Sequence, residues 1–103
     1  MHAVTLASLR TPAVLIDRAV ALRNIHRMQD AATAAGIRLR PHTKTHKSPV
    51  VARWQVDAGA SGICCAKLGE AEVLADAGFT DSQGRGVDGE YRDHSVLLGL
   101  RYA

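Results

Sequence analysis

The feature that most constrains the fold is a repeated order of short apolar runs and helix-forming segments, punctuated by glycine. In each helical segment apolar residues recur every three or four positions, as on the buried side of an amphipathic helix. Gly36, Gly59 and Gly78 directly follow these segments, and glycine commonly ends a helix. This alternation predicts an α/β fold in which crossover helices connect parallel strands. The expected helices cover residues 18–35, 49–58 and 70–77, and the expected strands cover residues 12–16, 37–43 and 61–66.

A strongly basic segment lies at the end of the second expected strand. Residues 38–47 read RLRPHTKTHK and contain four lysines and arginines and two histidines, with no acidic residue. The carboxyl end of such a strand is where an α/β protein holds an anionic cofactor. Lys44 is our candidate for a nucleophile there, because neighbouring positive charges favour the uncharged amine that attacks a carbonyl carbon. A solvated surface lysine is the alternative.

Three residues around Lys44 are further candidates for the same site. His42 and His46 lie two positions before and after it, and Arg40 lies two positions before His42. On an extended segment these side chains would share one face, so that a histidine could orient a cofactor or transfer a proton. The two histidines lack a third metal ligand, and we assign no metal site. A helix-capping or carboxylate-paired arginine is the alternative for Arg40.

Four other charged residues receive less weight. Lys67 ends the third expected strand and could line the same site at the carboxyl ends of the strands. Lys47 is interpreted as a surface charge beside a helix. Glu70 and Glu72 are expected to be solvated at the start of the third helix, where acidic side chains interact favourably with the helix dipole.

Composition excludes several classes of protein. The chain has 103 residues, enough for one small domain, and 13 basic against 10 acidic residues give a net charge of +3. Most of this excess lies in residues 38–47, so we expect no nucleic-acid face, and no run is apolar enough to cross a membrane. We find no signal peptide and expect a cytoplasmic protein. The adjacent Cys64 and Cys65 lack zinc-ligand spacing and are expected to be reduced thiols in a buried strand.

The alternating pattern stops near Asp81. Residues 82–103 contain four of the nine glycines and have no clear period before residues 95–98. Residues 84–89 superficially resemble a glycine-rich phosphate loop but follow no expected strand. We therefore predict one α/β unit over residues 1–81 and a flexible tail over residues 82–103.

Three segments resemble the D-threonine aldolase and D-serine dehydratase family. The octapeptide at residues 40–47 is similar to the family's signature. Residues 11–17 with Asn24 and Ile25 resemble its opening strand and helix, and residues 62–72 resemble the next strand and helix. The resemblance implies a partial (β/α) barrel of the alanine-racemase type, consisting of the first βα units only.

The resemblance also implies a chemistry. In this family the first lysine of the signature, here Lys44, binds pyridoxal 5′-phosphate, and Arg40, His42 and His46 become candidate cofactor-binding residues. The implied activity is a D-threonine-aldolase-like lyase that cleaves D-3-hydroxy amino acids, with D-serine dehydration or amino-acid racemisation as alternatives. The implied partner is a small D-amino acid, and a homodimer is consistent with the full-length family. A divalent metal is expected only in the family's C-terminal domain.

The chain also departs from the family. A complete barrel of this type needs about 250 residues, and the sequence after Asp81 no longer resembles the family. Our hypothesis is a truncated or frame-shifted chain with little or no activity on its own. Two alternatives of another class stay open: a pyridoxal-phosphate-binding protein without turnover, and a non-catalytic module that binds anions through residues 38–47.

Overall fold

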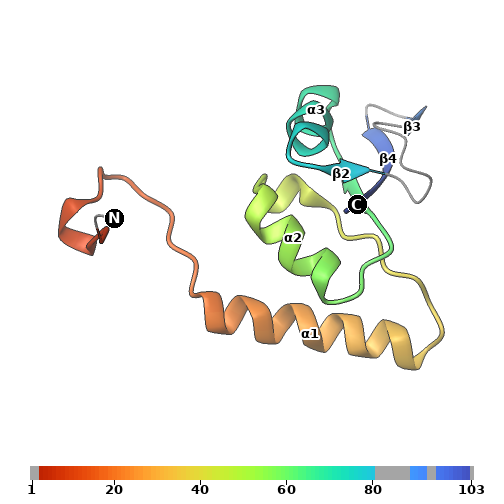
Figure 1. The fold of residues 1–103 in the computed structure, drawn as a ribbon, viewed down its shortest axis with the longest axis horizontal. Helices are drawn as coiled ribbons and strands as arrows, with labels where there is room; N and C mark the ends of the chain where they lie inside the picture. Colours follow the sequence, from red (N-terminus) through yellow and green to blue (C-terminus); the bar gives the residue numbers. More distant parts are fainter. Residues whose placement is uncertain (1–2, 81–88, 93–94, 103) are drawn as a thin grey trace.

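The chain is described by a computed structural model that covers residues 3–80, 89–92 and 95–102 (Figure 1). Helical elements occupy most of the first 80 residues, and short strands follow. In chain order the elements are η1 (Leu6–Ser8), α1 (Arg18–Ala34), η2 (Thr43–Thr45), α2 (Pro49–Asp57), β1 (Ile63–Cys65), α3 (Leu68–Asp76), β2 (Phe79–Thr80), β3 (Gly89–Arg92) and β4 (Ser95–Tyr102).

The three expected helices are confirmed as α1, α2 and α3, and local signals explain where they begin and end. The Asp17 side chain accepts the Val20 N–H at 3.1 Å and caps α1. Ser48 caps α2 in the same way, and a proline occupies the first helical position. The glycines that follow the three helices all have positive φ, a region that side chains disfavour.

The sheet differs from the predicted one. The strand order is β1-β4-β2, with β3 also paired to β4, and every described strand pair is antiparallel. The described residues show parallel pairing only at an isolated bridge between His42 and Cys64. The predicted partial (β/α) barrel is therefore not confirmed.

Two expected strands do not form within the described residues. Residues 12–16 run as an extended arm, and the Val14 side chain is 93% exposed. In residues 37–43 the carbonyls of Leu39 and Pro41 accept single hydrogen bonds from Ser61 and Cys64, each at 2.9 Å, but no ladder develops. A strand needs a continuous partner for its N–H and C=O groups, and these segments lack one.

Two strands lie in the range for which the sequence predicted a flexible tail. β4 begins at Ser95, where the apolar period of the sequence resumes, and pairs with β1, β2 and β3. Most of the glycine-rich stretch at residues 84–89 lies outside the described residues; Gly89 is the first residue of β3. The division of the chain at Asp81 stays a prediction.

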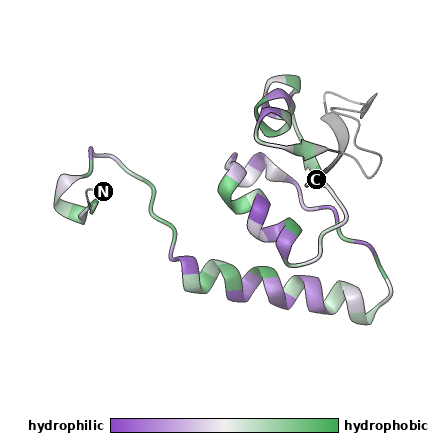
Figure 2. Ribbon diagram, viewed as in Figure 1, coloured by the Kyte–Doolittle hydropathy of each residue, from purple (hydrophilic) through white to green (hydrophobic). Residues whose placement is uncertain are grey.

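The hydrophobic core lies between α2, β1, α3 and β2 and consists of Ala52, Ile63, Cys65, Ala71, Leu74 and Phe79. Helix α1 lies outside this core and contacts α2, where the Arg18 guanidinium is 5.7 Å from the centre of the Trp54 ring. Hydrophobic and hydrophilic residues alternate along α1 (Figure 2). Because the N-terminal arm extends away from the core (Figure 1), the radius of gyration is 15.0 Å, above the value of about 13 Å typical of a chain this long.

Candidate functional site

Residues 43–47, the lysine loop, form a tight turn against β1. Thr43 begins the turn and is only 1% exposed. Its hydroxyl donates a hydrogen bond of 2.9 Å to the Cys64 carbonyl and lies 3.6 Å from the Cys65 sulfur. The Thr43 carbonyl in turn accepts the N–H groups of His46 and Lys47 at 3.3 and 2.7 Å. The start of the loop is thereby fixed to the core.

Lys44 lies in the middle of η2 and is exposed. Its backbone N–H donates to Nδ1 of His42 at 3.1 Å. Among the described residues no hydrogen bond or ion pair involves its amine, so the amine is free to react with a ligand. Lys44 thus presents an exposed amine on a turn whose first residue, Thr43, is fixed to β1.

The His42 ring is oriented by the lysine loop. Because Nδ1 accepts the Lys44 N–H, the neutral ring carries its proton on Nε2. Burial lowers the pKa of His42, the positive charge of Lys44 lowers it further, and the negative charge of Glu70 raises it in part. The uncharged ring therefore offers an Nε2–H donor beside Lys44.

The predicted shared face is wrong for Lys44 and His46, because residues 43–45 form a 3-10 helix instead of continuing the extended segment that ends at His42. The His46 ring turns toward α2: its Nδ1 accepts the Ser48 N–H at 3.0 Å, and its Nε2 lies 3.1 Å from Oε1 of Gln55. Both ring nitrogens of His46 thus have structural partners.

Arg40 is exposed and is associated with Cys64. Its carbonyl oxygen lies 3.8 Å from the Cys64 sulfur. Burial raises the pKa of the Cys64 thiol, and the charge of Arg40 opposes that rise. Within the described part of the chain, no hydrogen bond or ion pair links Arg40 to Lys44. The cofactor-binding roles of Arg40 and His46 stay predictions.

Lys47 is an exposed surface charge, as predicted, but the prediction of a solvated Glu70 is wrong, because Glu70 is paired with Lys47 and mostly covered. The Lys47 amine donates to Oε1 of Glu70, and Oε2 accepts the N–H groups of Ala66 and Lys67 at 3.0 and 3.3 Å. The Glu70 side chain is 15% exposed. Glu70, the third residue of α3, holds the glutamate position of a helix-start capping motif, but Lys67 replaces the motif's serine or threonine and caps no N–H with its side chain.

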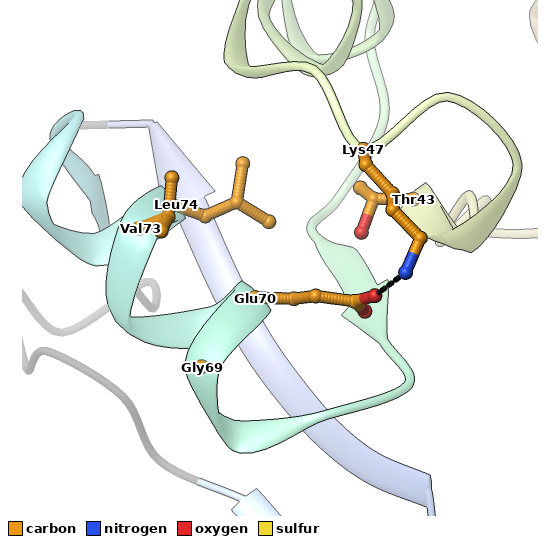
Figure 3. A pocket seen from close by; sticks show the side chains of 6 residues that line it. All are labelled: Thr43, Lys47, Gly69, Glu70, Val73 and Leu74. Atoms are coloured by element: carbon orange, nitrogen blue, oxygen red, sulfur yellow. Dashed lines mark hydrogen bonds and ion pairs between the residues drawn. The ribbon is translucent and has the colours of Figure 1, made fainter.

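A pocket of about 270 Å³ lies beside this ion pair (Figure 3). It is lined by Thr43 and Lys47 from the lysine loop and by Gly69, Glu70, Val73 and Leu74 from α3. Its volume is just below the range of about 300–1,000 Å³ typical of small-molecule sites. The pocket therefore lies between α3 and the first and last residues of the lysine loop.

The part of the chain that the structure describes holds neither a cluster of metal-binding side chains nor a membrane-spanning helix. No three histidine, cysteine, aspartate or glutamate side chains are grouped as they would be around a metal ion. No helix there combines the length and the apolar character needed to cross a membrane. Cys64 and Cys65 are free thiols, as predicted, and burial raises the pKa of Cys65.

No protein-family model matches the chain. It is similar, however, to D-threo-3-hydroxyaspartate dehydratase of Delftia sp. (strain HT23), with 54% identity over 77 residues, which cover 75% of the chain and 20% of that protein. It is also similar to D-threonine aldolase of Arthrobacter sp, with 42% identity over 76 residues, 74% of the chain and 20% of that protein. D-serine dehydratase of Dictyostelium discoideum is 36% identical over 50 residues, 48% of the chain and 13% of that protein.

The fold comparison agrees with the sequence comparison. The crystal structure of D-threonine aldolase from Filomicrobium marinum matches with a TM-score of 0.69 and 47% identity, over 74% of this chain and 21% of that one. The relatives are thus D-amino acid aldolases and dehydratases. The resemblance to the D-threonine aldolase and D-serine dehydratase family is confirmed: the chain's homologues, at 42–54% identity, are D-threonine aldolase and hydroxyaspartate aldolases and dehydratase. The chain spans about one fifth of the length of the first relatives named.

Proposed function

We propose that this chain carries the cofactor-binding lysine of a pyridoxal-phosphate-dependent lyase that acts on D-3-hydroxy amino acids. The observation that supports it most is Lys44, whose exposed amine has no partner among the described residues and lies on a turn held by the buried Thr43. Similarity to aldolases and dehydratases named for D-threonine and D-3-hydroxyaspartate supports the substrate class.

The described residues fit the aldehyde end of the cofactor. Pyridoxal phosphate, when bound, withdraws electrons from the substrate's Cα. Lys44 would hold it through its amine, because this amine has no competing partner among the described residues. His42 would orient a bound group by donating a hydrogen bond from its Nε2–H. The hydrogen bond from the Lys44 N–H to Nδ1 holds the ring and thereby sets the direction of this donor.

Two reactions of a D-3-hydroxy amino acid are consistent with the relatives' names. An aldolase breaks the bond between Cα and Cβ, and a dehydratase removes the proton on Cα and the hydroxyl on Cβ. We propose aldol cleavage, as the sequence resemblance implied. Dehydration is the second candidate, favoured by the 54% identity to a dehydratase.

The test is covalent trapping on the 103-residue chain. The chain is mixed with pyridoxal 5′-phosphate, reduced with borohydride, digested and analysed by mass spectrometry, with Lys44→Ala in parallel. Lys67, which is also exposed, is the internal control lysine. We expect modification at Lys44 to exceed that at Lys67 and to disappear in Lys44→Ala.

Equal modification of all three lysines, or none, would contradict the proposal. Salt-sensitive binding of polyanions that Lys44→Ala leaves unchanged would instead favour a basic anion-binding module. If trapping is selective, turnover of D-threonine and D-3-hydroxyaspartate is then assayed on the chain, and the carbonyl product distinguishes cleavage from dehydration.

A further inference from the structure

The Glu70 side chain connects the lysine loop to the start of α3. Its partner in the loop, Lys47, lies 23 residues earlier in the sequence. One carboxylate oxygen pairs with the Lys47 amine at the end of the lysine loop, and the other accepts the N–H groups of Ala66 and Lys67 before α3 (Figure 3 shows the ion pair). The hydrogen bond from Lys47 holds the pKa of Glu70 below its usual value, so the group stays a carboxylate near neutral pH. Glu70 is therefore fixed on the α3 side.

Lys47 has a backbone conformation that needs support. Its φ of 51° lies in the left-handed region, which is unfavourable for a residue with a side chain because the Cβ atom crowds the following carbonyl oxygen. Such a conformation persists only where the surroundings hold it. Here the Thr43 carbonyl accepts the Lys47 N–H at 2.7 Å, and Glu70 holds the side chain. The loop therefore closes on itself through its backbone and is attached to α3 through this ion pair.

Lys44 lies between these two attachments. Thr43, directly before Lys44, is hydrogen-bonded to β1. Lys47, three residues after Lys44, is paired with Glu70 on α3. We propose that Glu70, acting through Lys47, is a positioning residue that holds the lysine loop and thereby fixes the place of the Lys44 amine. For Lys44 as the cofactor lysine this inference rests on the proposed function; the holding of the loop does not.

The test compares Glu70→Gln, Lys47→Met and Lys47→Arg with wild type and with Glu72→Gln, a matched control at an exposed glutamate on the same helix. Glutamine keeps the length and an acceptor oxygen for the Ala66 and Lys67 N–H groups but removes the charge. The first readout is amide hydrogen exchange at residues 44–47, whose N–H groups include those bonded within the loop. Amides of α2 serve as the control for folding.

We expect exchange in the loop to be about 1.4- to fivefold faster in Glu70→Gln and Lys47→Met, the size expected for one partly exposed ion pair. Exchange in α2 should be unchanged, Glu72→Gln should match wild type, and Lys47→Arg should restore slow exchange. The second readout is the rate at which pyridoxal 5′-phosphate and borohydride modify Lys44, which should fall in the same two variants and recover in Lys47→Arg.

Each outcome is decisive. If amide exchange in the loop is unchanged in Glu70→Gln, the inference is overturned, regardless of the rate at which pyridoxal 5′-phosphate modifies Lys44. Faster exchange with an unchanged rate of Lys44 modification means that Glu70 stabilises the loop without positioning Lys44, which also overturns it. Unselective modification in wild type contradicts the proposed function alone, and the exchange data then still decide whether Glu70 holds the loop.

Discussion

Replacing Thr43 by valine should lower the free energy of unfolding by about 1–2 kcal/mol. The hydroxyl donates to the Cys64 carbonyl at 2.9 Å, and because Thr43 is 1% exposed no water can take its place. A net hydrogen bond contributes about 1 kcal/mol, and a buried acceptor left without its donor costs about 1–3 kcal/mol. Valine keeps the shape and the methyl group, so this loss belongs to the hydroxyl alone.

Two further substitutions separate the hydroxyl from the methyl group. Thr43→Ser keeps the hydrogen bond to Cys64 and loses one methyl group, at a cost of about 1 kcal/mol. Thr43→Ala loses both and should cost about 2–3 kcal/mol. Thr45→Val, at an exposed position of the same turn, is the matched control and should lie within about 0.5 kcal/mol of wild type.

The assay is equilibrium unfolding in urea, followed by the fluorescence of Trp54, the single tryptophan of the chain. Thermal unfolding offers a second measurement, with about 4–8 °C expected for each kcal/mol in a chain of this size. If Thr43→Val is as stable as wild type while Thr43→Ser is as unstable as Thr43→Ala, the hydroxyl does not anchor the loop. The account of how Lys44 is presented would then be wrong.

Three other predictions concern a helix start, the core and acid stability. Asp17→Ala removes the acceptor of the Val20 N–H and should cost about 1 kcal/mol, whereas Asp30→Ala at an exposed site on α1 should be neutral in the same urea assay. Leu74→Ala empties a position that is 4% exposed and should cost about 2–4 kcal/mol. The hydrogen bond from Lys47 lowers the pKa of Glu70 in the folded chain. The ionised Glu70 therefore stabilises the fold fully above the pKa of the unfolded chain, near 4.5, and this stabilisation is lost as the pH falls through the lower pKa of the folded chain. Urea midpoints measured between about pH 3 and pH 7 should therefore show an acid-side loss that Glu70→Gln lacks; the same loss in that variant would refute the assignment.

The candidate site was only partly predictable. The basic segment made Lys44 the candidate, and its role as the cofactor lysine stays a prediction; the structure places it exposed on a turn that Thr43 fixes to β1. The sequence missed Glu70 as the partner of Lys47, since nothing in the local pattern states that residues 47 and 70 meet. It also grouped His46 with Lys44, whereas a 3-10 turn directs the His46 ring to Gln55 on α2.

The sequence by itself determined the helices and the family. Caps such as Asp17, the glycines with positive φ and the apolar spacing act over a few residues, so a helix can be predicted from the chain alone. The signature at residues 40–47 is also a local pattern. Only the tertiary structure decided which segments become strands, because a strand exists only where a distant segment pairs with it. Residues 12–16 have strong strand propensity and form no strand, whereas β4, beyond the expected α/β unit, pairs with β1 and β2.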